Sequence, residues 1–126
     1  MSEHPNATMV RRMNDAMSAG NWQPLTDALA DDVVWHEIGR SEPFRGKAAL
    51  TAHYMGATPP DYQITAETHD VLASDDHTIA MTTATATRHG KTFTYRTAEI
   101  YHIKDGKITE RWAFSDDTDA INRFFA

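Results

Sequence analysis

The sequence predicts one α+β domain, with helices in its first part and an antiparallel sheet in the rest. Apolar residues recur at helical spacing between Ala7 and Tyr54. From Asp61 onward the apolar pattern changes to a period of two, which is typical of strands. Short polar turns join the later segments, so these strands are expected to pair as an antiparallel meander.

Helical periodicity predicts three helices before the sheet. The first covers residues 7–19, whose apolar face consists of Met9, Met13, Ala16 and Met17. Asn6 or Thr8 is expected to cap it, and residues 1–6 are interpreted as a flexible tail. The other two helices lie between Asn21 and Asp31 and over residues 47–54.

Five segments are rich in β-branched and aromatic residues and are predicted to be strands. They are residues 33–38, 62–72, 77–88, 91–103 and 107–115. His89-Gly90 and Asp105-Gly106 are expected to form tight hairpin turns. The last residues, 116–126, are expected to form a short turn or helix that packs Phe124 and Phe125 on apolar surface. We therefore expect a single domain over residues 1–126.

Composition excludes several classes of function. The net charge is -6 and the pI is about 5.5, whereas nucleic-acid binding requires a basic surface. The absence of cysteine excludes a disulfide framework and thiolate metal sites, and the seven histidines show no metal-ligand spacing. We expect no metal or other cofactor. No signal segment or long apolar run is visible, so we expect a cytoplasmic protein with no membrane contact.

Acidic residues lie on the heavier faces of the last two predicted strands. Alternation places Glu99 on one face with Tyr95 and Tyr101, and the other strand has a face formed by Ile108, Glu110, Trp112, Phe114 and Asp116. We expect both faces to point into the core or a cavity. A carboxylate there is paired with a cation, reaches water at an edge, or is desolvated with a raised pKa that suits acid–base catalysis.

Three segments together resemble the NTF2-like superfamily, and within it the SnoaL-like proteins. They are NDAMSAGNWQPLTDALADDVVWHE, SEPFRGKAAL and EIYHIKDGKITERWAFSD. The resemblance implies a cone-shaped, curved antiparallel sheet of about six strands, packed with three N-terminal helices around an internal apolar cavity. It also implies a homodimer formed through the sheet.

The resemblance to ketosteroid isomerases implies roles for two acids. WHEIGRSEPFRG is similar to the segment that holds the general base of that family, at the position of Glu37, and Glu99 matches its second acid. The phenol that the family carries on its first helix is replaced by Met13, which cannot donate a hydrogen bond. Tyr54, Tyr95 and Tyr101 are other hydroxyl candidates.

Two further enzyme classes of the superfamily bear on the last strands. The WAFSD end resembles the polyketide cyclases, which implies Asp116 as the catalytic acid or base; alternatively Asp116 caps the C-terminal turn. The limonene-epoxide hydrolases need an arginine two residues before the acid of the penultimate strand, which is Glu99 here. This chain has Thr97 at that position, so the catalytic triad of those enzymes is absent.

The main hypothesis is a cofactor-free acid–base enzyme acting on a hydrophobic carbonyl compound by isomerisation, cyclisation or dehydration. Glu37 would be the base, Glu99 a neutral donor or an electrostatic partner, and Asp116 the alternative base. The residues expected to line the pocket are Met13, Met17, Trp35, Tyr54, Met81, Tyr95, Tyr101, Glu110, Trp112 and Phe114. The rival hypothesis is a non-catalytic ligand-binding or dimerisation module.

Overall fold

The computed structural model describes residues 3–56 and 60–126, so residues 1–2 of the expected tail lie outside the described residues. It confirms the α+β class. The helices are α1 (Pro5–Ser18), α2 (Gln23–Ala28), α3 (Lys47–Tyr54) and α4 (Thr118–Phe125). The strands are β1 (Leu29–Trp35), β2 (Phe44–Arg45), β3 (Tyr62–Ala73), β4 (Thr78–Arg88), β5 (Lys91–Lys104) and β6 (Lys107–Ser115).

The start of α1 differs from the expectation. The helix begins at Pro5, so residues 5 and 6 belong to it and not to a tail. The cap is His4, whose Nδ1 accepts a hydrogen bond from the Asn6 backbone N–H at 3.1 Å, so the prediction of Asn6 or Thr8 is wrong. Proline suits the first helical turn because its missing N–H would have no partner there.

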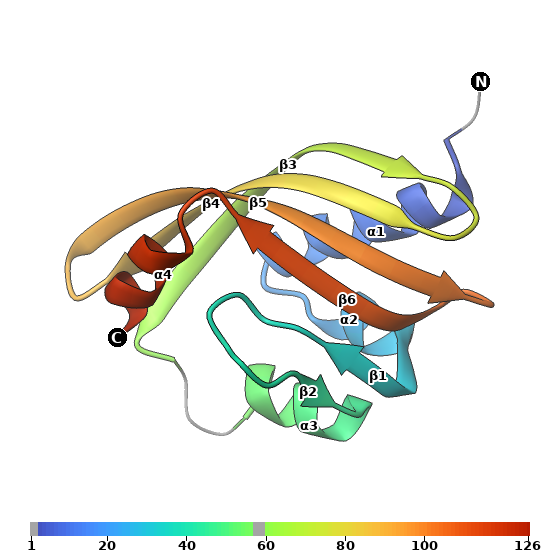
Figure 1. Ribbon diagram of the computed structural model, residues 1–126, viewed down its shortest axis with the longest axis horizontal. Coiled ribbons are helices and arrows are strands. Elements are labelled where there is room, and N and C mark those ends of the chain that lie inside the picture. The colour runs from blue at the N-terminus through green and yellow to red at the C-terminus, as the bar shows by residue number, and fades with distance from the viewer. Residues whose placement is uncertain (1–2, 57–59) are drawn as a thin grey trace.

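The sheet is mixed and open, with the strand order β2-β1-β6-β5-β4-β3. Strands β3 to β6 form the expected antiparallel meander. β1 pairs in parallel with β6, so the prediction of a wholly antiparallel sheet is wrong at this position. Figure 1 shows β1 beside β6. The last strand of the meander thus returns to lie next to the first strand of the chain.

Two tight turns fix the register of the meander as predicted. Asp105 and Gly106 have φ of 52° and 76°, and His89 and Gly90 have the same pair of values. Two successive residues with positive φ are typical of the hairpin turn whose twist matches that of the strands. Glycine tolerates this conformation at no steric cost, which explains its place in each turn.

A bulge in β6 changes which side chains face inward. His102 pairs with Glu110 and Ile103 pairs with Ile108, so Thr109 is an extra residue in β6. Beyond it Arg111 lies opposite Tyr101, and an extra residue reverses the alternation of faces. The predicted inward face of β6 is therefore wrong after Ile108, which remains buried.

The core lies between the inner face of the sheet and the helices. Figure 1 shows α1 and α2 on one face of the curved sheet, with α4 at the end where β4 and β5 form their hairpin. The larger buried residues are Val10, Met13, Leu25, Leu29, Val33, Trp35, Leu50, Val71, Tyr101, Ile103 and Ile108. α4 is anchored by Ile121, which is buried, and by Arg88, whose Nη1 donates to the Phe124 carbonyl at 3.0 Å.

None of the helices in residues 3–56 and 60–126 is long and apolar enough to cross a membrane.

Candidate functional site

Glu37 follows the end of β1, at the point where the backbone separates from the neighbouring strand β6. The backbone N–H of His36 makes the last bond to β6, donating to the Arg111 carbonyl at 2.8 Å. One Glu37 oxygen accepts from the Tyr54 hydroxyl at 3.4 Å, and the other lies 3.5 Å from His53 Nε2. The Glu37 side chain is 27% exposed. Within the described residues no Lys or Arg forms an ion pair with it.

Glu99 is held by a buried ion pair. Arg111 Nη2 donates to Glu99 Oε2 at 2.7 Å, and the two side chains are only 10% and 13% exposed. The hydroxyls of Thr82 and Tyr101 also donate to this carboxylate, each at 3.3 Å. Three donors therefore surround this carboxylate, and one of them is the Arg111 guanidinium. An ion pair with Arg111 is the contact expected of an electrostatic partner, one of the two roles considered from the sequence.

Arg111 keeps its charge despite its burial. Burial alone would lower the pKa of Arg111, but the charge of Glu99 and the hydroxyls of Tyr101 and Tyr54 outweigh it, so the pKa is raised. Arg111 Nη1 also donates to the His36 carbonyl at 3.0 Å, and the guanidinium lies over the Trp35 ring, 4.6 Å from its centroid. The inner region therefore contains a permanent cation.

Two buried N–H donors near this pair have no hydrogen-bond partner among the described residues: Arg111 Nε and Trp35 Nε1. A buried donor left unpaired costs about 1–3 kcal/mol. In folded proteins such groups are usually satisfied by ordered water, by an ion or by a small movement of a neighbouring group.

The inner tyrosines are neutral hydroxyl donors. Burial, followed by the charge of Glu37, raises the pKa of Tyr54. Burial and the charge of Glu99 raise the pKa of Tyr95 to about 12 and also raise that of Tyr101. Tyr54 donates to Glu37 and Tyr101 donates to Glu99, so buried hydroxyls support both acids.

Four residues predicted to line the pocket lie on the outer face of the sheet, and two of them, Trp112 and Phe114, border the open groove described below. Glu110 pairs with His36 Nε2 at 3.0 Å, and Trp112 stacks on the His36 ring. Phe114 is 58% exposed and Met81 41% exposed. The bulge at Thr109 explains the β6 residues, and Met81 lies opposite Ala98, also on the outer face.

The remaining predicted residues divide between core and surface. Met13 is fully buried, and Met17 packs against the same core. Asp116 is exposed and accepts a hydrogen bond from the Arg96 N–H at 3.1 Å. The cap of α4 is Asp117, which accepts from the Ala120 N–H at 2.9 Å, so the prediction of Asp116 as cap is wrong by one residue.

Sequence reasoning missed His53 and Arg111. His53 was weighed only as a metal ligand, although its place directly before Tyr54 puts it on the helix that faces Glu37. Simple alternation would put Arg111 on the face opposite to Glu110, Trp112 and Phe114, and only the bulge turns Arg111 inward. Among the described residues no group of three or more His, Asp or Glu side chains is arranged to hold a metal ion.

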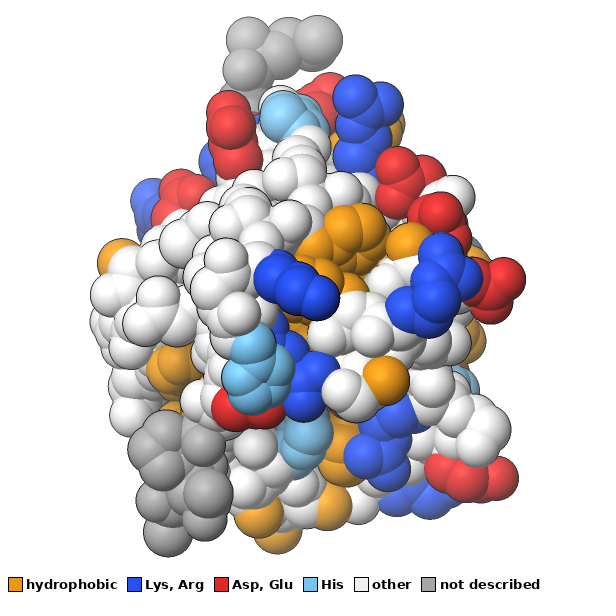
Figure 2. Space-filling model, turned by 90° about the vertical axis from the view of Figure 1, so that its left-hand side faces the viewer, with side chains coloured by type: hydrophobic (Ala, Val, Ile, Leu, Met, Phe, Trp, Pro, Cys, Tyr) orange, Lys and Arg blue, Asp and Glu red, His pale blue; other side chains and the backbone are white. Residues whose placement is uncertain are grey.

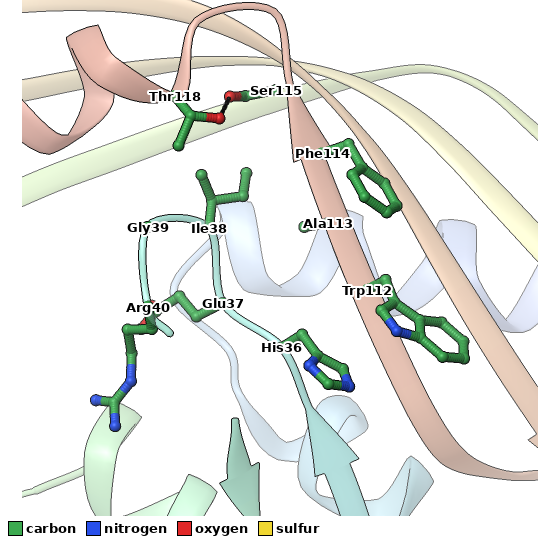
Figure 3. A pocket seen from close by; sticks show the side chains of 10 residues that line it. All are labelled: His36, Glu37, Ile38, Gly39, Arg40, Trp112, Ala113, Phe114, Ser115 and Thr118. Carbon is green, nitrogen blue, oxygen red and sulfur yellow. Dashed lines mark hydrogen bonds between the residues drawn. The ribbon is translucent and has the colours of Figure 1, made fainter. Parts of the chain in front are cut away.

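An open groove of about 280 Å³ lies beside Glu37 (Figure 3). Its lining residues are His36, Glu37, Ile38, Gly39, Arg40, Trp112, Ala113, Phe114, Ser115 and Thr118. Figure 3 shows the turn after β1 on one side and β6 on the other, with the Ser115–Thr118 hydroxyl pair at one end.

Figure 2 views the molecule from the end that holds α4. Basic, acidic and histidine side chains gather near the middle of this view, and hydrophobic side chains form small separate groups.

The sequence profile of the SnoaL-like domain matches residues 10–111, which is most of the chain. The chain belongs to the SnoaL-like family. This confirms the resemblance to the NTF2-like superfamily. No curated protein matches this SnoaL-like chain.

Three solved structures show the same fold as this SnoaL-like protein. Bal32a, from a soil-derived mobile gene cassette, is 28% identical with a TM-score of 0.81 and covers 96% of each chain. A proposed SnoaL-like polyketide cyclase from Jannaschia sp. CCS1 is 13% identical with a TM-score of 0.78, covering 99% of this chain and 96% of that one. A proposed ketosteroid isomerase from Kribbella flavida is 19% identical with a TM-score of 0.67, covering 88% of this chain and 77% of that one.

Proposed function

We propose that this SnoaL-like protein is a cofactor-free acid–base enzyme that removes a proton next to the carbonyl group of a hydrophobic compound. The supporting observation is the environment of Glu37. Its carboxylate is partly buried, is held by His53 and Tyr54, and has no Lys or Arg ion partner among the described residues. A positioned carboxylate of this kind can accept a proton.

The reaction needs only groups of this chain. Glu37 takes the proton as the C–H bond breaks, and the electron pair of that bond forms an enolate whose negative charge lies on the carbonyl oxygen. The protonated Glu37 then returns the proton to a different carbon, which gives an isomer. Arg111 would stabilise the enolate, because a fixed charge in a water-poor region acts strongly on developing charge.

The inner donors suit this chemistry. Arg111 Nε and Trp35 Nε1 are buried donors without a partner in the described structure, and a substrate oxygen reaches them only when neighbouring side chains move. Tyr54 would support the Glu37 carboxylate through its hydroxyl. Relatives in fold include the proposed isomerase and the proposed polyketide cyclase, which is consistent with carbonyl chemistry. Met13 lies in the core, so the phenol that ketosteroid isomerases carry at this position has no counterpart.

Replacement of the base tests the proposal. Hydrophobic ketones would be incubated with the protein in heavy water, and deuterium exchange at the carbon next to the carbonyl would be followed by NMR. For a ketone that exchanges, Glu37→Gln is expected to lower the rate about 100-fold to 10,000-fold, the usual range for a general base. Glu110→Gln removes a carboxylate on the outer face and is expected to leave the rate unchanged. Equal rates for Glu37→Gln and the unaltered protein would remove Glu37 from its role.

The ion pair of Glu99 favours a second candidate, a non-catalytic ligand-binding module. A carboxylate neutralised by Arg111 is not available as a base. On this hypothesis ketones bind but none exchanges its protons, and Glu37→Gln changes affinity only. The same experiment, with binding followed by NMR line broadening, distinguishes the two functions.

A further inference from the structure

The wall of the sheet opens between β1 and β6, beside Glu37. After the bond from His36 N to Arg111 O, the chain turns away from β6: Gly39 has a φ of +86°, and Arg40 N donates to the Glu37 carbonyl at 3.1 Å. β6 continues to Ser115. Beyond Arg111, this edge of β6 has no neighbouring strand in residues 3–56 and 60–126.

This opening is the groove of about 280 Å³. Figure 3 shows Ile38 and Ala113 on its two sides, and the hydroxyls of Ser115 and Thr118, 2.8 Å apart, close one end. Glu37 lines the groove and also contacts Tyr54 inside the domain. The groove thus connects the surface with the proposed base.

The backbone of Ala113 presents a polar group to the groove. Backbone groups of alternate residues in a strand point to the same side, so the N–H of Ala113 points the same way as the Arg111 carbonyl, toward β1. In a continued parallel ladder the carbonyl of His36 would accept from this N–H. That carbonyl instead accepts from the Arg111 side chain, at 3.0 Å. Within the described residues, the Ala113 N–H has no hydrogen-bond partner.

We propose that this groove is the subsite through which a hydrophobic carbonyl compound reaches Glu37. The N–H of Ala113 donates to a hydrogen-bond acceptor of the ligand, and the side chains of Ile38 and Ala113 limit its width. The volume lies near the lower end of small-molecule sites, which span roughly 300–1,000 Å³, and therefore suits a compound of about two fused rings. The choice of ligand class rests on the proposed function, whereas the site itself does not.

The first test uses two ligands of the same shape. 2-Acetylnaphthalene carries a carbonyl oxygen, and 2-isopropenylnaphthalene has a CH2 group in its place. In an NMR titration of the 15N-labelled protein, the ketone is expected to move the Ala113 amide proton downfield and to bind about five-fold more tightly than the alkene, the usual effect of one hydrogen bond. Equal affinities, or an Ala113 amide that does not respond to the ketone, would overturn the proposal.

The second test fills the groove. Ala113→Leu and Ile38→Trp are each expected to weaken binding of the ketone at least ten-fold, while Ala49→Leu on the exposed side of α3 leaves it unchanged. Folding of each variant is checked by its amide spectrum, and the ligand pair still tests the proposal on the unaltered protein if a variant fails to fold. Folded groove variants that bind as tightly as the unaltered protein would refute it. The exchange rate of Glu37→Gln bears on the base, whereas ketone binding by the unaltered protein bears on the subsite, so the two proposals can fail separately.

Discussion

Glu99 and Arg111 form a buried ion pair on the inner side of the sheet. Both side chains are nearly buried, and each satisfies the charge of the other. Removing one partner leaves a buried charge without compensation, which costs about 3–5 kcal/mol. The pair therefore links β6 to β5 at the position where the bulge has turned Arg111 inward.

We predict that Arg111→Met lowers the free energy of unfolding by about 3–5 kcal/mol, because the Glu99 carboxylate loses its cation. Urea unfolding followed by circular dichroism measures the change. The double variant Arg111→Met, Glu99→Leu is expected to recover most of the loss, since the stranded charge is gone. A double variant no more stable than the single one would show that the ion pair is not the cause.

The tyrosines give a prediction for alkaline pH. The pKa of Tyr95 is raised from 10.0 to about 12, and the pKa values of Tyr54, Tyr62 and Tyr101 are raised as well. A raised pKa in the folded state means that the neutral tyrosine stabilises the fold at pH below 10, and this contribution is lost as the pH rises through 12.

Phenolate absorbance, recorded with circular dichroism, follows this titration. We expect the folded protein at pH 10 to show less phenolate than the same chain in denaturant, and absorbance to appear together with the loss of structure at higher pH. Half-ionised tyrosines in a fully folded protein at pH 10 would contradict the burial of these hydroxyls. Tyr95→Phe is the control that removes one of the four.

At the level of elements, turns and caps act locally, and the bulge acts across the sheet. The Asp105-Gly106 and His89-Gly90 turns could be predicted because positive φ angles select particular residues. The bulge at Thr109 could not, since no residue type is specific for it. Its consequence is large, because every later residue of β6 changes face.

The cap of α4 gives a prediction at this scale. Asp117 accepts a hydrogen bond from the Ala120 N–H, so Asp117→Ala is expected to lower the free energy of unfolding by about 1 kcal/mol. Denaturant unfolding checks the value. Asp76→Ala, at an exposed turn before β4, is the matched control and is expected to change little. An effect of Asp117→Ala no larger than that of the control would argue against the cap.

At the level of the whole molecule, the outer face of the sheet has two apolar rows that cross its strands. The first row is Leu72, Ile79, Ile100 and Trp112, and the second is Met81, Ala98 and Phe114. Leu72 and Phe114 are more than half exposed. Neither row contains a charge, although Asp70 lies opposite Met81 at the end of the second row and Glu110 lies on the same face beside Trp112. We propose the homodimer through this face, as the family resemblance implied.

Leu72→Lys places a charge in the first row and is expected to shift the protein from dimer to monomer in sedimentation velocity experiments. Thr87→Lys, exposed on the same sheet outside the rows, is expected to leave the dimer intact. A protein that is monomeric without any substitution, or a Leu72→Lys variant that stays dimeric, would refute this interface.

Local patterns of the sequence determined much of this protein. They determined the class, the last four strands, the two hairpin turns, the third helix and the family, because periodicity and turn chemistry depend on nearby residues. They also singled out Glu37, which the structure places against Tyr54.

Only the tertiary structure decided which groups meet. The parallel pairing of β1 with β6 brings Glu37 near a strand that lies some seventy residues later in the chain. The extra residue Thr109 brings Arg111 to Glu99 and moves Trp112 and Phe114 outside. Helix α3 adds His53 and Tyr54 to Glu37. These contacts depend on strand register and on packing between distant segments, and neither is specified by the spacing of residues along one segment.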